Sequence, residues 1–153
     1  MRKTLLLGLA ALLAAATLAG TATATHAARR VVISTRKLPK LGLVLVTGSG
    51  RTLYMFEPDK RRRVTCVSTC ASLWPPLKLA KGAEPLARGN AKASLLGSDR
   101  DPEGGRVVTY HGWPLYTYVG DGGPGAANGQ ALNSAGGRWY VLSPSGKVIR
   151  TKR

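Results

Sequence analysis

The pattern of apolar and polar positions after residue 40 is typical of short β-strands separated by turns. Residues 41–47 are apolar and rich in Val and Leu, Gly48 to Gly50 supplies a turn, and residues 51–56 continue as a second strand. Two further strand pairs joined by short turns are predicted over residues 107–119 and 138–151. Helical periodicity is short, and only residues 68–73 are expected to form a helical turn. The pattern therefore predicts an all-β fold.

Two stretches between these strands are rich in glycine and are expected to be long loops. They cover residues 81–106 and 120–137, and both also contain proline. Long loops in a compact domain are usually either functional or mobile, so both are candidate locations for a site.

One short phrase occurs twice in the chain. Residues 53–59 and 115–121 both read Leu-Tyr-x-aromatic-x-x-Asp, the second copy lies 62 residues after the first, and a tryptophan (Trp74 or Trp139) follows each copy. A repeat of this length predicts two related halves that pack on each other. We therefore expect one small domain over residues 41–153, sandwich-like or barrel-like, with repeat 1 at about 41–80 and repeat 2 at about 105–145.

The aromatic residues of the phrase are expected to build the core between the halves. Side chains alternate between the two faces of a strand, so Tyr54 and Phe56 share one face, as do Tyr116 and Tyr118. Paired aromatic rings suit a buried interface, with the phenol hydroxyls reaching partners at its edge. The alternative is an exposed aromatic platform for sugars or other flat ligands.

The aspartates of the phrase pose a separate question. Along an extended strand, the five residues from Tyr54 to Asp59, or from Tyr116 to Asp121, span roughly 16 Å, so the groups within one repeat meet only if the chain bends. Both aspartates lie in segments that signal bends, where a carboxylate readily accepts hydrogen bonds from nearby backbone N–H groups. We expect them to end the strands. The alternative is that pseudo-symmetry brings both carboxylates together as a paired-carboxylate or cation site.

The N-terminus has the features of a secretory signal peptide over residues 1–27. Two positive residues precede an apolar stretch over residues 5–18, and cleavage is expected near Ala24 or Ala27. The alternative is a retained membrane anchor, but the apolar stretch is short for a bilayer crossing, so the mature chain is expected to have no transmembrane segment. Thr21 stands where a lipoprotein signal would have cysteine, so lipidation is not expected. Residues 28–40 read as a basic linker.

The charge of the chain favours anionic partners. The formal net charge is +16, of which the predicted signal peptide carries only two positive charges. Basic residues cluster in Lys60-Arg61-Arg62-Arg63, a possible polyanion-binding segment. For an exported protein, the available polyanions are lipid headgroups, wall polymers and extracellular DNA. The basic residues are not interleaved with aromatic residues, so specific nucleic-acid binding is not expected. The alternative is a solvated basic surface that only keeps the protein soluble.

Cys66 and Cys70 are the only cysteines, and in an exported protein they are expected to form a disulfide. The alternative is a redox or copper-like metal site that uses both thiolates, with His111 or the aspartates as candidate further ligands. This alternative lacks an evident third ligand. The sequence contains no nucleophile elbow, phosphate loop or zinc-protease pattern, so we predict no catalytic residues, no cofactor and no enzymatic activity.

These elements together resemble the bacterial secreted-repeat family, often described as predicted lipoproteins with a Y-x-(F/W/Y)-x-x-D motif. The resemblance covers roughly residues 41–145 and includes the two phrases, the cysteine segment that leads to Trp74, and the segment around Trp139. It implies an exported, envelope-associated domain of unknown biochemical function, and it assigns no catalytic residue. The expected function is a non-enzymatic binding module for anionic surfaces at the cell envelope. The alternative is the redox or metal-binding protein.

Overall fold

The computed structural model describes residues 30–60 and 63–152. The predicted signal peptide and two arginines of the basic cluster, Arg61 and Arg62, lie outside these residues. The described chain is mostly β-structure with one short α-helix, which confirms the all-β prediction. Its elements in chain order are β1 (Val32–Leu38), β2 (Gly42–Thr47), β3 (Tyr54–Phe56), η1 (Glu57–Asp59), α1 (Thr69–Leu73), β4 (Lys78–Leu79), β5 (Leu86–Ala87), η2 (Ala93–Leu95), β6 (Leu96–Arg100), β7 (Arg106–Tyr110), β8 (Trp113–Pro114), β9 (Asn133–Ser134) and β10 (Gly137–Val141).

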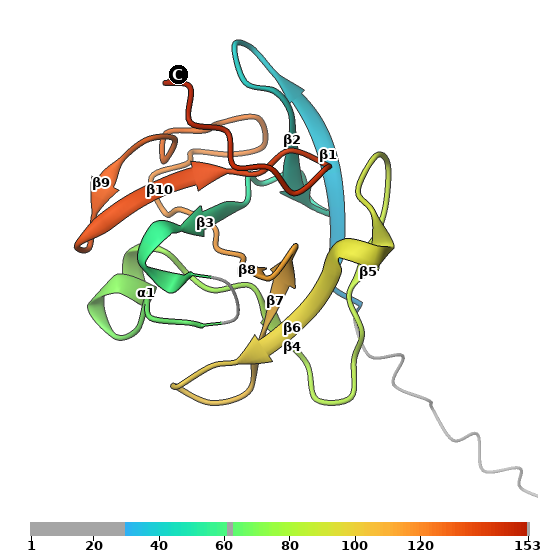
Figure 1. The fold of residues 1–153 in the computed structure, drawn as a ribbon, viewed down its shortest axis with the longest axis vertical. Helices are drawn as coiled ribbons and strands as arrows, with labels where there is room; N and C mark the ends of the chain where they lie inside the picture. Colours follow the sequence, from blue (N-terminus) through green and yellow to red (C-terminus); the bar gives the residue numbers. More distant parts are fainter. Residues whose placement is uncertain (1–29, 61–62, 153) are drawn as a thin grey trace, which may run out of the picture.

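The strands form small sheets, and none of those in the described chain closes into a barrel. In the first sheet, β1 pairs antiparallel with β2 and parallel with β5. In the second, β10 lies between β3 and β9. In the third, β7 lies between β4 and β6 and also pairs with β8. Figure 1 shows the long β1–β2 hairpin on one side of the molecule and β9 with β10 on the other.

The strand order begins earlier than the sequence pattern indicates. Residues 28–40 read as a linker, but β1 lies within them and pairs with β2 from Ile33 to Leu38. Ile33 and Leu38 are buried, whereas Arg36 and Lys37 are exposed between them. The basic residues make this segment resemble a linker in composition. They are compatible with a strand because they occupy solvent-facing positions at the outer part of the hairpin.

Other expected elements are present with different partners. The predicted hairpin over residues 107–119 is β7 with β8, and the predicted helical turn is α1. The second half of the second predicted strand is β3, which pairs with β10, while Thr52 in the first half forms a bridge with Val46 of β2. The predicted loop over residues 81–106 is also shorter than expected, because it contains β5, η2 and β6. Short strands with long-range partners leave little local signal, which explains these differences.

Strand β3 lies between two hydrophobic clusters. Tyr54 and Phe56 belong to one cluster, and Met55, together with the preceding Leu53, belongs to the other. Both clusters are made of residues from both repeats, so the core is shared between the halves. The alternation of side chains along the strand therefore distributes the repeated phrase over two faces that are both buried.

Candidate functional site

The first aspartate of the repeated phrase is turned into the protein interior. Directly after β3, residues Glu57–Asp59 form the 3-10 turn η1, with Pro58 at its start. Proline suits the first turn of a helix because its ring fixes a helical φ and it has no N–H to satisfy. The turn reverses the chain and leaves Asp59 fully buried, and Asp121 of the second repeat is also buried, with 3% exposure.

Each aspartate is bound by the tyrosine of the other repeat. The Tyr116 hydroxyl donates to Asp59 Oδ2 at 2.6 Å, and the Tyr54 hydroxyl donates to Asp121 Oδ2 at 2.8 Å. We call these two reciprocal bonds the tyrosine–aspartate clasp. Within one repeat, an extended strand would hold the tyrosine and the aspartate too far apart to meet. In the structure, the tyrosine of each repeat instead binds the aspartate of the other repeat.

Backbone pairing positions the two tyrosines for this exchange. Tyr54 and Tyr116 form an antiparallel bridge in which each backbone N–H donates to the carbonyl of the other, at 2.9 and 3.0 Å. This two-way pairing places the two repeats side by side at equivalent residues. The tyrosines therefore mark the pseudo-symmetry axis of the domain.

The second oxygen of each carboxylate fixes the loop that follows it. Asp59 Oδ1 accepts hydrogen bonds from the backbone N–H of Thr65 at 2.7 Å and from its hydroxyl at 2.6 Å. Asp121 Oδ1 accepts from the backbone N–H of Asn128 at 2.7 Å. The aspartates thus shape the turns as expected, but they do so from buried positions. Thr65 and Asn128 were not identified from the sequence, because they lie at different offsets in the two repeats.

The electrostatics of the clasp depend on burial. Loss of solvent raises the pKa of Asp59 above its ordinary value of 3.8, although the hydrogen bonds from Thr65 and Tyr116 act in the opposite direction. Burial also raises the pKa of Tyr116 above its ordinary value of 10.0, and the nearby Asp59 carboxylate adds to this shift. Tyr116 is therefore a neutral hydrogen-bond donor at physiological pH.

The aromatic rings of both repeats form one continuous stack. Trp74 and Trp139 are stacked with a centroid distance of 3.8 Å and an interplanar angle of 1°. Tyr118 stacks on the outer face of Trp74 at 4.1 Å, and Phe56 stacks on the outer face of Trp139 at 4.2 Å. Each tryptophan is thus covered by an aromatic residue of the other repeat. Tyr54 meets the edge of Trp74, and Tyr116 meets the edge of Trp139.

The repeated phrase is consequently an internal frame. Tyr54, Phe56 and Tyr116 are buried, and only Tyr118 has a partly exposed ring. A surface platform for flat ligands would need these rings at the surface. The cation site between the two aspartates stays a hypothesis. Each carboxylate is committed to a tyrosine and a loop, and the described residues contain no group of three or more His, Cys, Asp or Glu side chains placed to hold a metal ion.

The two cysteines are joined in a disulfide directly before the first tryptophan. Cys66 and Cys70 lie 5.2 Å apart at their Cα atoms, and Cys70 is within α1. The backbone N–H of Trp74 donates to the Cys70 carbonyl at 2.8 Å. The bridge therefore anchors the segment that delivers Trp74 to the aromatic stack. Thiolate ligation of a metal would first require reduction of this bond.

Comparison with known protein families agrees with this two-repeat construction. Residues 35–78 and 97–143 match the family described as a secreted repeat of unknown function. The chain belongs to this family. No match was found among curated proteins, and no solved structure matches the chain. The two matched segments coincide with the two halves that exchange tyrosine and aspartate partners, so the family resemblance inferred from the sequence is confirmed.

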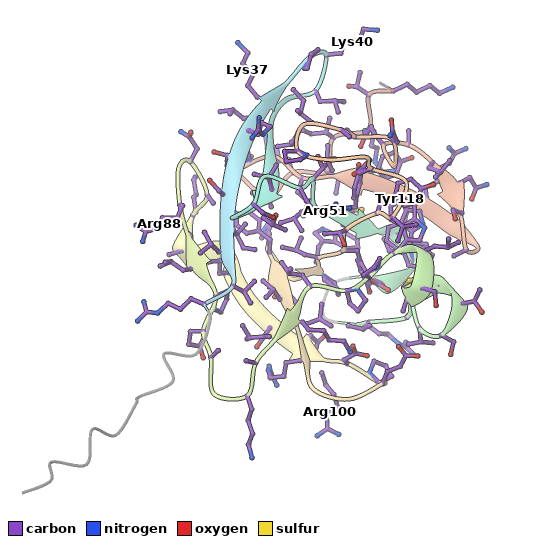
Figure 2. The ribbon with its side chains drawn as sticks, turned by 180° about the vertical axis from the view of Figure 1, so that it is seen from behind. Lys37, Lys40, Arg51, Arg88, Arg100 and Tyr118 are labelled. Carbon is purple, nitrogen blue, oxygen red and sulfur yellow. A yellow bond between two sulfur atoms is a disulfide. The ribbon has the colours of Figure 1, made fainter. Side chains whose placement is uncertain are left out.

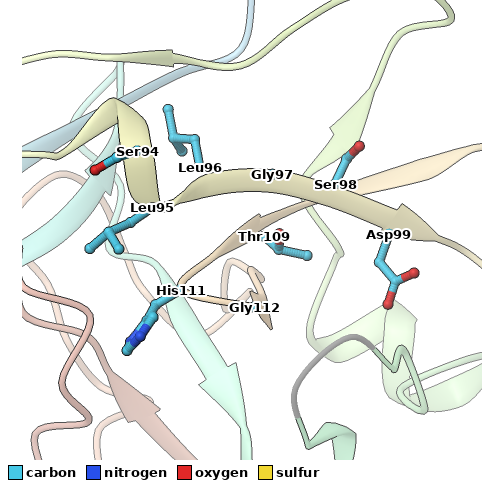
Figure 3. Close-up of a pocket in the computed structure, with 9 residues that line it drawn as sticks. All are labelled: Ser94, Leu95, Leu96, Gly97, Ser98, Asp99, Thr109, His111 and Gly112. Carbon is cyan, nitrogen blue, oxygen red and sulfur yellow. The ribbon is translucent and has the colours of Figure 1, made fainter.

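In this secreted-repeat protein, His111 lies in a polar groove of about 540 Å³ that is lined by residues of η2, β6, β7 and the turn after β7 (Figure 3). Its Nδ1 atom is 3.2 Å from the carbonyl oxygen of Gly146, and its backbone has a φ of +50°. Within the described residues, no serine or threonine hydroxyl of the groove is hydrogen-bonded to His111. Asp99 also lines the groove, and one of its oxygens is buried without a hydrogen-bond partner. The groove therefore lacks a paired nucleophile and base.

The surface of the secreted-repeat domain is strongly basic. Figure 2 shows Lys37 and Lys40 near the tip of the β1–β2 hairpin and Arg100 at the opposite end of the molecule. Two ion pairs occur among the described residues, Lys78 with Asp101 and Arg150 with Glu57. The described lysines and arginines are exposed, except Arg51, which is partly buried; the exposed ones are Arg30, Arg36, Lys37, Lys40, Lys60, Arg63, Lys78, Lys81, Arg88, Lys92, Arg100, Arg106, Arg138, Lys147, Arg150 and Lys152.

No helix in the described part of the chain is long and apolar enough to cross a membrane.

Proposed function

We propose that this secreted protein is a non-enzymatic interaction module that binds an anionic polymer of the cell envelope through its basic surface. The observation that supports the proposal is that acidic side chains are partly buried, whereas basic side chains are mostly exposed. Three of the seven acidic residues are buried: Asp59 and Asp121 in the clasp, and Asp101 against Lys78. Most basic side chains remain at the surface, so the outside of the molecule carries an uncompensated positive charge.

Such a surface attracts polyanions over distances of about one Debye length, roughly 8 Å at physiological ionic strength. The basic residues are distributed around the molecule, which suits an extended flexible polymer better than a small compact ligand. The stacked tryptophans, Trp74 and Trp139, are buried in the core and are not available to stack on nucleic-acid bases, which argues against a single-strand binder. The internal frame then serves to hold this charged surface rigidly outside the cell.

The test is a binding series with the purified mature domain. An anionic wall polymer, vesicles that contain anionic lipid, and duplex DNA are each titrated at salt concentrations from about 50 to 200 mM. We expect the wall polymer to bind most tightly, and its affinity to fall steeply with salt because counterions are released on binding. Absence of binding to every polyanion at low salt would contradict the proposal. Stronger binding to vesicles or to DNA would assign a different partner.

Two separate measurements test the redox or metal-binding alternative. Metal analysis of protein purified from its native compartment, together with titration of its thiols, reports on the state of Cys66 and Cys70. A disulfide-bonded protein without bound metal supports the interaction module. Two reactive thiols with stoichiometric copper would favour the alternative.

A further inference from the structure

A small polar groove lies on the first sheet. It has a volume of about 250 Å³ and is lined by Ser34, Thr35, Arg36, Val46 and the turn over residues 47–50. We call it the hairpin groove. Small-molecule sites usually have volumes of about 300–1,000 Å³, so this groove suits one functional group of a larger ligand.

The turn of the groove presents an unused hydroxyl hydrogen. Thr47 Oγ1 accepts a hydrogen bond from the backbone N–H of Arg51 at 3.1 Å, and it lies 2.9 Å from Ser49 Oγ. The two hydroxyl groups have two hydrogens, and their mutual bond uses only one of them. Whichever hydroxyl donates in that bond, the other keeps a hydrogen for a ligand.

Strand β1 adds the hydroxyl of Ser34, which lies on the same face of the strand as Arg36 because side chains alternate along it. Thr35 lies on the other face, where its Oγ1 accepts a hydrogen bond from the backbone N–H of Asn90 at 3.1 Å. Ser34 Oγ lies beside Gly89, where a Cβ atom would be 3.5 Å away, and a Cβ there would be 2.9 Å from Thr35 Oγ1. The segment after β5 therefore packs against Ser34 and Thr35 at the edge of β1.

Arg36 supplies the charge of the groove. Its guanidinium lies over Gly50, because a Cβ built on Gly50 would be only 3.0 Å from Arg36 Nη2 and 3.2 Å from Pro124 Cβ. In the described part of the chain, no carboxylate lines the groove and none forms an ion pair with Arg36. Arg88 is exposed close by, since its backbone N–H donates to the Ile33 carbonyl of β1. The guanidinium is thus held in place while its donors remain available.

We propose that the hairpin groove binds one phosphate group of a phosphodiester polymer, with Arg36 as the charged ligand and the hydroxyls of Ser34 and the Thr47–Ser49 pair as donors. Donors on several sides fit a tetrahedral phosphate better than a planar carboxylate, and a guanidinium can bind two phosphate oxygens at once. The large exposed apolar residues of the described chain are Leu43, Leu73 and Val119, and none of them lines the groove. A polyol-phosphate chain is therefore favoured over a bilayer. This inference rests on the proposed function and names the chemistry of its partner.

The experiment compares three single variants with the wild-type mature domain. Arg36→Gln removes the charge, Arg36→Lys keeps it but loses the forked geometry, and Arg138→Gln is the matched control, an exposed arginine on β10 outside the groove. Binding to poly(glycerol phosphate), to poly(glutamate) of equal charge and to phosphatidylglycerol vesicles is measured at constant salt. Thermal denaturation checks that each variant is folded.

We expect Arg36→Gln to weaken binding of poly(glycerol phosphate) about tenfold, in line with a lost charge-assisted hydrogen-bond pair. Arg36→Lys should weaken binding of the polymer several-fold, and Arg138→Gln by no more than about twofold. Inorganic phosphate should compete with the polymer only for the groove, so it should weaken polymer binding by the wild type but not by Arg36→Gln. Binding to poly(glutamate) should respond equally to Arg36→Gln and Arg138→Gln. Equal effects of these two variants on the phosphate polymer would overturn the groove but leave the proposed function standing. A larger Arg36 effect with vesicles than with the polymer would overturn the choice of a polymer.

Discussion

At the scale of single residues, the two tyrosine hydroxyls connect the repeats through buried hydrogen bonds. Tyr54 and Tyr116 each bind a buried carboxylate that belongs to the other repeat, at 2.8 and 2.6 Å. A buried charged or polar group that loses its partner costs more than a typical hydrogen bond contributes, because its desolvation is no longer offset. The clasp is therefore more important to stability than two surface hydrogen bonds would be.

Removing either clasp hydroxyl should destabilise the domain. For Tyr116→Phe and for Tyr54→Phe we expect a loss of about 1–3 kcal/mol in the free energy of unfolding, since each change leaves a buried carboxylate with one donor fewer. Tyr118→Phe is the matched control, because Tyr118 is partly exposed and stacks on Trp74 without such a carboxylate. Urea denaturation followed by tryptophan fluorescence measures all three. Equal effects at positions 116 and 118 would argue against the clasp.

The raised pKa of Asp59 predicts a pH dependence of stability. Because burial raises this pKa in the folded state, the folded protein binds a proton more readily than the unfolded chain. The resulting contribution to stability is fully present below pH 3.8 and is lost as the pH rises through the folded-state value. The stability of wild type relative to Asp59→Asn should therefore fall as the pH rises from acid toward neutral. Urea denaturation of both proteins across this range tests it. A difference that moves the other way would mean that hydrogen bonding outweighs burial.

At the scale of elements, the loop between Gly120 and Gln130 contributes buried residues to the core at both of its ends. Asp121 binds Asn128 within it, and Gly129 approaches Tyr54 and Trp74 closely. A Cβ atom on Gly129 would be 2.7 Å from Trp74 Cη2 and 3.0 Å from Tyr54 Cζ. Glycine is thus required here for the close approach of backbone to ring, although sequence composition alone indicates only a long flexible loop.

A side chain at Gly129 should disturb the aromatic stack. Gly129→Ala is expected to lower the free energy of unfolding by about 1–3 kcal/mol, because the surrounding rings are buried and cannot move away freely. Gly122→Ala is the control, since a Cβ there meets no atom within 4 Å. It should change stability by less than about 1 kcal/mol. Near-UV circular dichroism reports on the tryptophan pair, and an unchanged spectrum with unchanged stability in Gly129→Ala would contradict this description of the loop.

Sequence patterns predicted some elements better than others for clear reasons. The strand over β2 and the β7–β8 hairpin are continuous and locally patterned, so they were predicted. The alternation along β3 also placed Tyr54 and Phe56 on one face correctly. Strand β1 was missed because its basic residues dominate its composition, and β5 has only two residues whose partner lies far away in sequence.

At the scale of the whole molecule, the repeats are interlocked. The clasp exchanges tyrosines and aspartates, the stack places an aromatic residue of one repeat on the tryptophan of the other, and β3 of the first repeat pairs with β10 of the second. Each half therefore completes the core of the other. The sequence predicts that the two repeats form a single domain, and the interlocked core leads us to expect that they also fold as one unit.

Neither half should fold alone. We expect fragments cut after Asn90, covering residues 30–90 and 91–153, to lack a cooperative unfolding transition, because each leaves buried aromatic surface and a carboxylate without partners. Circular dichroism during thermal denaturation measures this for each fragment. An equimolar mixture that regains the transition would confirm that the halves complement each other. A cooperative transition in either isolated fragment would contradict the interlocked arrangement.

The sequence by itself determined the class of fold, the two repeats, the family and the excess of positive charge. These properties are local or additive, since strand alternation, a repeated phrase and a count of charges can each be read without knowing which segments meet. Only the tertiary structure decided that the tyrosine of one repeat binds the aspartate of the other, and that the hairpin groove gathers hydroxyls around Arg36. Such contacts depend on chain reversal at η1 and on pairing across the pseudo-symmetry axis, which no local pattern encodes.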